Sequence, residues 1–468
     1  MDIVGEAEQK ISRECVENNV KEEVRLSQEI GLPTLQDISG TIHQGLVCSI
    51  DMGWQKRASG NRYDSSSGVS LAIGGLGNKI IGNHVCCSHC RVCDEWARVK
   101  EGTASLHSQE TVKVREHRCP KNYSEGSAKG MEAHAAVNIV RNIYHSSTRL
   151  QGCIPAFVHT TVSDDDSSTW SNLQQSLEQL LERHNQGLVA KGLPPTTKKE
   201  WSLWPKDKKN QPKKDYGKLN VDELPPQLNL ADPNHRCKVL GKHIYPLTKE
   251  RKTSGKQISK AYAERFKVNF NRALHQSRDK DAQGLRDALL ATLEHEFNNH
   301  EYCSTDWCRW LKAENDPAER AALACRWMSK DKDATLYESL HAIYMSFLTP
   351  KRVQQMHHKY NTQKNEAMNH KISRLCPKNT TYSKSMVLSD RVAWVIAEDS
   401  IGGLGALTAV YRLLGIGKPP PILLDYYATN DKKRDHHRAY TRRPEVIYRR
   451  RKALNEKNSK GQSNACTI

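Results

Sequence analysis

Three acidic residues lie where carboxylates could act together on a phosphate group. Asp51 follows the apolar run 45–50, and Asp164 follows the run 158–163. Each run has the length and β-branched content of a buried strand, and a charge at a strand tip is costly to bury unless it is paired or binds a metal ion. Glu366 lies far downstream in a segment of helical pattern. Two strand-tip aspartates and one helical glutamate suggest a two-metal site for phosphoryl transfer.

Such a site needs carboxylates held on rigid elements, so that two ions about 3.5–4 Å apart can steady the attacking and leaving oxygens. Oxygen ligands favour Mg²⁺ or Mn²⁺ over zinc. Simpler roles are open for each residue: Asp51 could cap a strand, Asp164 to Asp166 could form a turn, and Glu366 could face solvent. The three residues together favour the metal site.

A second group of chemical residues is rich in sulfur. Cys90-x-x-Cys93 is followed about two dozen residues later by His117-x-Cys119, which gives four soft ligands for a closed, structural zinc site at the end of a strand. Ordinary buried thiols are the alternative. Competing ligands nearby are His84, Cys86, Cys87 and His89.

A looser cluster, His300-x-x-Cys303-x4-Cys308 with Cys325 beyond it, could hold a second zinc ion. The 14 cysteines of the chain are concentrated in such clusters, which favours zinc over disulfides in a reducing compartment.

The charge of the chain indicates its partner. The formal net charge is +18 and the isoelectric point is about 9.2, an excess of cations that favours nucleic acid through counterion release. No stretch approaches the about 18 apolar residues of a membrane span, and the charged opening segment has no signal-peptide core. We therefore expect a soluble, intracellular protein that binds DNA and no membrane.

The pattern of elements is mixed α/β. Strands are predicted near 47–51, 69–73, 79–85 and 153–162, with a helix over 131–144 before the last strand. The expected order is β-β-β-α-β, in which Asp51 and Asp164 end neighbouring strands.

The remaining segments are predicted to be helical or basic. Residues 1–40 are expected to form a charged, peripheral helix, and the Lys- and Pro-rich run 198–217 cannot form a core. Apolar stripes predict helices over 258–299 and 318–348, and one helix over 353–375 should carry Glu366. The predicted domains are 1–43, the N-terminal segment; 44–170, the first catalytic part with a zinc element at 84–122; 171–350, linker and helical insertion; 351–415, the final catalytic part; and 416–468, a basic tail.

Several residues beside the acidic positions could contact DNA. Cations directly after Asp51 could meet phosphates, and the tryptophan there could pack beneath the metal site or in the core. The asparagines flanking Glu366 could contact DNA, bond to backbone or face solvent. The candidate DNA-binding residues are Trp54, Lys56, Arg57, Asn365 and Asn369.

These motifs together resemble the Mutator-like transposases of eukaryotic mobile elements. The segments that carry the resemblance are 51–57, 90–93, 117–132, 163–168, 361–369 and 377–378, within a similarity that spans roughly residues 45 to 405. The resemblance implies a ribonuclease H-like domain with a DDE triad of Asp51, Asp164 and Glu366, split by a helical insertion. Asp165 stands where such proteins often have glycine, so Asp166 remains an alternative second aspartate and metal ligand.

The resulting expectation is a nuclear DNA transposase that cleaves the ends of its element with Mg²⁺ or Mn²⁺ and joins the freed 3′-hydroxyl to target DNA. Double-stranded DNA and a second copy of the chain are the expected partners. The alternative is a domesticated protein that binds zinc and DNA without cutting. The intact set of three carboxylates argues against that alternative.

Overall fold

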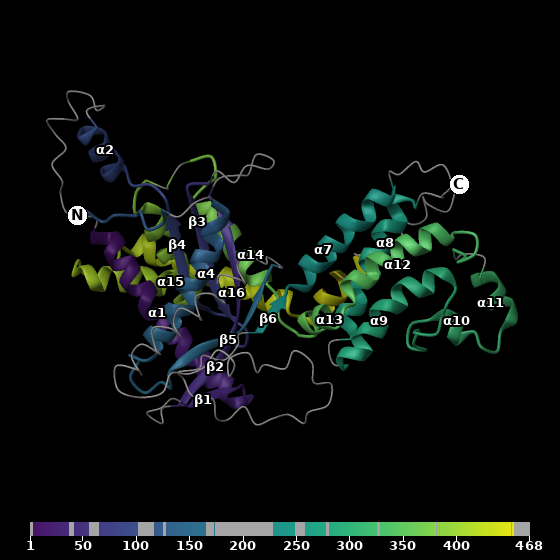
Figure 1. The fold of residues 1–468 in the computed structure, drawn as a ribbon. Helices are drawn as coiled ribbons and strands as arrows, with labels where there is room; N and C mark the ends of the chain where they lie inside the picture. Colours follow the sequence, from purple (N-terminus) through teal and green to yellow (C-terminus); the bar gives the residue numbers. More distant parts are fainter. Residues whose placement is uncertain are drawn as a thin grey trace. The chain divides into compact units, whose positions relative to one another are not determined.

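In the computed structural model the chain forms two compact units (Figure 1). The first unit comprises Met1–Asn229 and Thr362–His437, and the second comprises Leu230–Asn361 and Arg438–Ile468. The residues described are 3–36, 42–55, 65–101, 117–124, 128–164, 173, 228–248, 258–277, 280–324, 328–380, 382, 384–450 and 452–453.

A mixed sheet forms the centre of the first unit. Its strands are β1 (Thr34–Gln36), β2 (Ile42–Trp54), β3 (Ser67–Gly74), β4 (Ile80–Cys87), β5 (Ala156–Ser163) and β6 (Leu228–Ala231). The boundary between the two units in the sequence, after Asn229, falls within β6. The strand order is β4-β3-β2-β5-β6, and β1 pairs with β2 outside this path. The pairs β2–β3 and β3–β4 are antiparallel, whereas β2 and β5 are parallel. The predicted mixed α/β class and the β-β-β-α-β order are confirmed.

Helices cover both faces of this sheet. Helix α4 (Ala128–Ser147) packs on one face through residues such as Ile139, where Val20 of α1 (Ile3–Glu29) joins the same cluster. Helix α1 also packs against the helix Val387–Leu414 through residues such as Ile11. Helices α14 (Gln363–Leu375) and α15 (Val387–Leu414) pack on the other face through residues such as Met368 and Val392. The first unit is therefore a three-layer α/β/α arrangement.

The side chains of β2 point alternately to the two faces of the sheet, and this alternation determines which of them contact α14. Leu46, Cys48 and Ile50 belong to the cluster on the α4 face. Because successive side chains of a strand point to opposite faces, Ser49 and Asp51 face the α14 layer. The strand thus presents an acidic residue to the helix that carries Glu366.

Two expectations about the helices are wrong. Helix α1 is not peripheral, because Ile11, Val20 and Val24 are at most 3% exposed in the core. The single helix expected over 353–375 is instead two helices, α13 (Pro350–Met356) and α14, separated by six residues. The two helices therefore do not share one continuous apolar face.

The region expected to be a basic tail contains helix α16 (Pro421–Thr441). Its Asp431 accepts hydrogen bonds of 3.0 Å from the backbone N–H groups of Gly403 and Leu404. These groups begin the second half of α15, which is kinked at Gly402, where φ is +82°. Asp431 therefore caps the helix at its kink.

The second unit is helical. Phe266, Phe270, Tyr344 and Phe347 form its centre, where aromatic rings meet edge to face. Its elements are α7 (Pro233–Ile244), η1 (Tyr245–Thr248), α8 (Lys260–Gln276), α9 (Ala282–Glu294), η2 (His295–Phe297), α10 (Arg309–Lys312), α11 (Pro317–Ala324), α12 (Ala334–Phe347) and α13.

One helix of the described residues, α15, is long and apolar enough to cross a membrane by length and composition. Half of its most apolar window is buried within the protein, and buried core helices meet the same criterion. The observed packing against the sheet accounts for its apolar character.

Candidate active site and metal clusters

The register of the sheet brings Asp51 and Asp164 to the same level. The last pair between the parallel strands β2 and β5 is Ser49 with Val162. Two residues further along each strand are Asp51, still within β2, and Asp164, directly after β5. The two carboxylates thus leave adjacent strands at one edge of the paired region.

Electrostatic interactions join Glu366 to this pair. Burial, the largest cause, and the negative charges of Asp164 and Glu366 together raise the pKa of Asp51 to about 7. Hydrogen bonds from the Met52 backbone and the Asn369 side chain act in the opposite direction. Three carboxyl groups from positions far apart in sequence therefore share one electrostatic environment that favours a bound cation.

Two asparagines fix α14 on the sheet. Asn365 is fully buried; its Nδ2 donates to the backbone oxygens of Ser49 (3.2 Å) and Leu71 (2.8 Å), and its Oδ1 accepts from the Ser49 hydroxyl at 2.5 Å. Asn369 Nδ2 donates to Asp51 Oδ2 at 2.8 Å. A Cβ atom added at Gly53 would lie only 2.8 Å from Asn369 Oδ1, so glycine permits this close approach.

These contacts correct the predicted DNA interface. Asn365 has no exposed surface for DNA, and its role is the bonding to backbone that the sequence left open. Trp54 packs beside Met52 and Met131 on the α4 face, opposite to Asp51, so it does not lie beneath the acidic residues. Lys56 and Arg57 lie outside the described residues, as does Asp166.

The four predicted zinc ligands come together in the first unit. One ligand atom each from Cys90, Cys93, His117 and Cys119 lies within 4.8 Å of the others. His117 Nε2 is 3.2 Å from Cys90 Sγ and 3.5 Å from Cys93 Sγ, and the Sγ atoms of Cys93 and Cys119 are 3.6 Å apart. A tetrahedral zinc ion needs separations of about 3.5–3.8 Å between such atoms. The cluster can therefore bind zinc.

The competing ligands have other surroundings. Cys86 is buried with its Sγ donating to Met131 O, and Cys87 packs in the core between sheet and α14. His84 lies against the ring of His134, and His89 is 3.4 Å from Asp94. The choice of quartet made from spacing is thus supported by the geometry.

The zinc cluster is tied to the core through the residue between two of its ligands. Arg118 Nη2 lies 2.6 Å from Asp390 Oδ1, near the start of α15. The same Asp390 oxygen accepts a 2.7 Å hydrogen bond from Gln9 of α1. The order of the 117–119 segment therefore affects how α1 and α15 are held together.

A second cluster lies in the helical unit and contains a ligand that the sequence analysis missed. His300, Cys303 and Cys308 are brought together as expected, and His295 completes the group. The signal was present, because His295 lies five residues before His300 in a segment already rich in ligands. Cys325 lies outside the described residues, and the structure supplies His295 as the fourth member.

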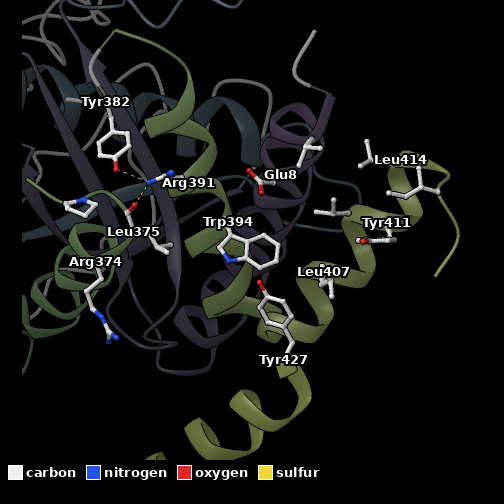
Figure 2. Close-up of a pocket in the computed structure, with 14 residues that line it drawn as sticks. Glu8, Arg374, Leu375, Tyr382, Arg391, Trp394, Leu407, Tyr411, Leu414 and Tyr427 are labelled. Atoms are coloured by element: carbon white, nitrogen blue, oxygen red, sulfur yellow. Dashed lines mark hydrogen bonds between the residues drawn. The ribbon is translucent and has the colours of Figure 1, made fainter. Parts of the chain in front are cut away.

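A groove of about 790 Å³ opens between α1, α14, α15 and α16 in the first unit (Figure 2). Trp394 and Tyr427 meet edge to face in it, with ring centroids 5.7 Å apart. Arg391 closes one end by donating to the Tyr382 hydroxyl and the Leu375 carbonyl. None of its lining residues, all of which are described, is one of the three carboxylates.

Comparison with known protein families gives one match, in the N-terminal part of the chain. Residues 2–185 match the model of the Mutator-like transposase family, so this part of the chain is similar to Mutator-like transposases. The resemblance predicted from the motifs is confirmed over these residues, and such a family implies an enzyme that cleaves and joins DNA. The match includes Asp51, Asp164 and the first zinc cluster, and it ends before Glu366. No curated protein and no solved structure gives a match.

Proposed function

We propose that the chain is a DNA transposase whose catalytic carboxylates are Asp51, Asp164 and Glu366. The observation that supports it most directly is the geometry: Asp51 and Asp164 leave adjacent parallel strands at the same level, and Asn369 of the helix that carries Glu366 bonds to Asp51. The raised pKa of Asp51, to which the charges of both other carboxylates contribute, agrees with it. Repulsion among three acids in a partly buried site is typical of a centre that works with a cation bound.

The fold of the catalytic part is proposed to be ribonuclease H-like. Support comes from the strand order β4-β3-β2-β5-β6, in which three antiparallel strands continue into a parallel pair. In this arrangement the acidic residues come from the central strand, its parallel neighbour and a helix packed on the sheet. The helical unit between Asp164 and Glu366 would be the insertion that splits the domain.

Asp51, Asp164 and Glu366 would hold Mg²⁺ or Mn²⁺, since carboxylate oxygens suit these hard cations and repel one another without them. Bound ions would stabilise the charge on the attacking and leaving oxygens of the phosphodiester. Within the chain, Asn369 orients the Asp51 carboxylate, and Asn365 fixes the first turn of α14, from which Glu366 projects into solvent. Asp166 remains an alternative to Asp164.

The reaction proposed is hydrolysis of one strand at the element end, followed by attack of the freed 3′-hydroxyl on target DNA. The net charge of +18 supports DNA as the partner, and nuclear localisation and assembly as a homo-oligomer are part of the same proposal. The first Cys/His cluster would bind one structural zinc ion.

The experiment is cleavage of a plasmid that carries the element ends by the purified chain with Mg²⁺ or Mn²⁺. Asp51→Asn, Asp164→Asn and Glu366→Gln are each expected to abolish cleavage while DNA binding persists. Asp425→Asn is the matched control, because Asp425 is exposed on α16 and the change removes the same charge. Asp166→Asn distinguishes the two candidates for the second aspartate.

The outcomes separate two functions. Cleavage by the parent chain that depends on the three carboxylates supports the transposase. DNA binding without cleavage by any of the proteins, in either metal, would overturn it in favour of a domesticated DNA-binding protein. Calorimetric titration with Mn²⁺ adds a readout that needs no cleavage, because each of the three changes should weaken metal binding.

A further inference from the structure

The second Cys/His cluster sits in a fixed part of the helical unit. His295 begins the 3-10 turn η2 directly after α9. The residues on either side of it are buried and paired: Glu294 accepts from Lys330 and Tyr337 at 2.7 Å each, and Glu296 pairs with Arg265 at 2.8 Å. The imidazole of His295 is therefore held in place from both sides.

The ligand atoms have the mutual distances of a tetrahedral centre. The Nδ1 atoms of His295 and His300 are 3.2 Å apart. Cys303 Sγ lies 3.5 and 3.7 Å from these two nitrogens, and Cys308 Sγ lies 3.8 and 3.5 Å from them. Zinc bonds of about 2.0–2.1 Å to nitrogen and 2.3 Å to sulfur require about 3.3 Å between nitrogens and about 3.5 Å between nitrogen and sulfur.

Hydrogen bonding alone does not account for this arrangement. Each Nδ1 is close to the other Nδ1 and to both sulfurs, whereas a neutral imidazole nitrogen either donates one hydrogen or accepts. A cation at the centre satisfies all four atoms at once, because each offers it a lone pair.

A neighbouring side chain selects the form of His300 that binds metal. His300 Nε2 lies 3.2 Å from Asn298 Oδ1, an atom that only accepts. A hydrogen bond to this oxygen requires the proton on Nε2, and in that tautomer Nδ1 presents its lone pair to the centre of the cluster. Asn298 has a φ of +57°, a left-handed conformation that asparagine tolerates better than most residues. Such a bond to the second ring nitrogen is typical of histidines that ligate metals.

Aromatic rings limit the access of water to the cluster. The Trp310 ring is stacked on His300 with centroids 5.0 Å apart, and Trp307 meets His295 edge to face at 5.2 Å. Cys308 is fully buried. With four protein ligands and this enclosure, the cluster has the form of a structural site with no position for substrate.

We propose that His295, His300, Cys303 and Cys308 bind a second zinc ion, with both imidazoles ligating through Nδ1 and Asn298 orienting His300. Two thiolates and two imidazoles in tetrahedral arrangement suit Zn²⁺ rather than the hard cations of the carboxylate site. The ion would fix residues 295–313, a stretch of short helices and turns, against the core of the helical unit. This proposal does not rest on the transposase function.

The test is the metal content of the full-length chain, loaded with zinc and freed of excess, by plasma mass spectrometry. Two ions per chain are expected for the parent protein, and one each for Cys303→Ser and for Cys93→Ser. Cys237→Ala is the control, because Cys237 is a buried thiol of the same unit outside the cluster, and two ions should remain. One ion in the parent chain, lost entirely in Cys93→Ser, would overturn the proposal.

Cobalt substitution provides a second measurement, made in a chain whose second cluster is unaltered. In Cys93→Ser, bound Co²⁺ should show tetrahedral d–d bands with charge transfer from two thiolates. Asn298→Gly keeps the left-handed backbone without strain and removes the acceptor, so it should retain the site with zinc affinity lower by about 10–100-fold. Absent cobalt bands in Cys93→Ser would overturn the assignment of the site. Unchanged zinc affinity in Asn298→Gly would overturn the role of Asn298 in orienting His300.

Discussion

Asn369 Nδ2 donates a hydrogen bond of 2.8 Å to Oδ2 of Asp51, from helix α14 to strand β2. These residues are 318 positions apart in the sequence. Because Glu366 lies on the same helix, the bond orients one acidic residue while it fixes the element that carries another. The Asp51 carboxyl also accepts a hydrogen bond from the Met52 backbone, so its orientation is set from both its own strand and α14.

Loss of this bond should impair catalysis more than binding. Asn369→Ala is expected to lower the rate of DNA cleavage by about 10–100-fold, because a ligand's orienting partner is removed while the ligand stays. The measurement is single-turnover cleavage together with DNA affinity. His370→Ala, an exposed change at the next position of α14, serves as the control. A fall in DNA affinity with an unaltered rate would show instead that Asn369 contacts DNA.

The carboxylate cluster should cost stability in the metal-free chain. The pKa of Asp51 is raised to about 7 from about 4, so the folded state binds its proton more tightly than the unfolded state does. The penalty is absent below about pH 4, develops as pH rises toward 7 and is complete above it. Asp51→Asn should therefore raise Tm by several degrees at pH 8 and change it little at pH 4.

Thermal scans at the two pH values, with and without Mn²⁺, test this relation. Mn²⁺ should narrow the difference in Tm between Asp51→Asn and the parent chain at pH 8, because a bound cation stabilises the ionised carboxyl of Asp51, which only the parent chain has. Equal Tm values for the two proteins across the pH range would contradict the raised pKa. Asp425→Asn again controls for the loss of one charge from the surface.

Two ion pairs between α14 and α15 should contribute differently to the free energy of unfolding. Lys364 pairs with Asp399 at 2.9 Å, and the Asp399 side chain is 4% exposed. Lys371 pairs with Glu398 at 3.0 Å, and the Glu398 side chain is 24% exposed. Removing the cation from a buried carboxylate leaves a charge without its partner. Lys364→Ala should lower the free energy of unfolding by about 2–4 kcal/mol, and Lys371→Ala by less than about 1 kcal/mol.

Urea denaturation of both variants measures this difference, and the less buried pair, Lys371 with Glu398, is the built-in control. Equal losses would show that helix propensity or packing, rather than burial of the charge, determines the contribution of Lys364. The cleavage rate of Lys364→Ala should also fall, because Glu366 is two residues away on the same first turn of α14.

Removal of zinc from the first cluster should loosen the N-terminal helix. Arg118 lies between the ligands His117 and Cys119 and pairs with Asp390, which also accepts from Gln9 of α1. Cys119→Ser or chelation is expected to release this segment and to raise amide hydrogen exchange in α1 and at the start of α15. Arg118→Ala should raise exchange at the same amides while the chain keeps its zinc. If the protection of these amides from hydrogen exchange stayed unchanged after zinc loss, the zinc cluster would not stabilise the packing of α1 and α15.

Local sequence was sufficient for much of the fold. The β-branched runs around Asp51 and Asp164 predicted strands, and Cys90-x-x-Cys93 with His117-x-Cys119 predicted a metal cluster. These predictions are accurate because strand alternation and the spacing of metal ligands depend on residues close together in the chain.

Only tertiary structure decided the functions of residues whose surroundings come from distant segments. The sequence treated Asn365 and Asn369 alike, but burial against β2 and β3 commits Asn365 to backbone and leaves Asn369 for Asp51. The place of His295 beside Cys308 and the burial of α1 against α15 likewise became evident only from the packing. The identities of the acids, thiols and imidazoles were determined by sequence alone; their partners depended on packing, because hydrogen bonding, burial and charge act through space rather than along the chain.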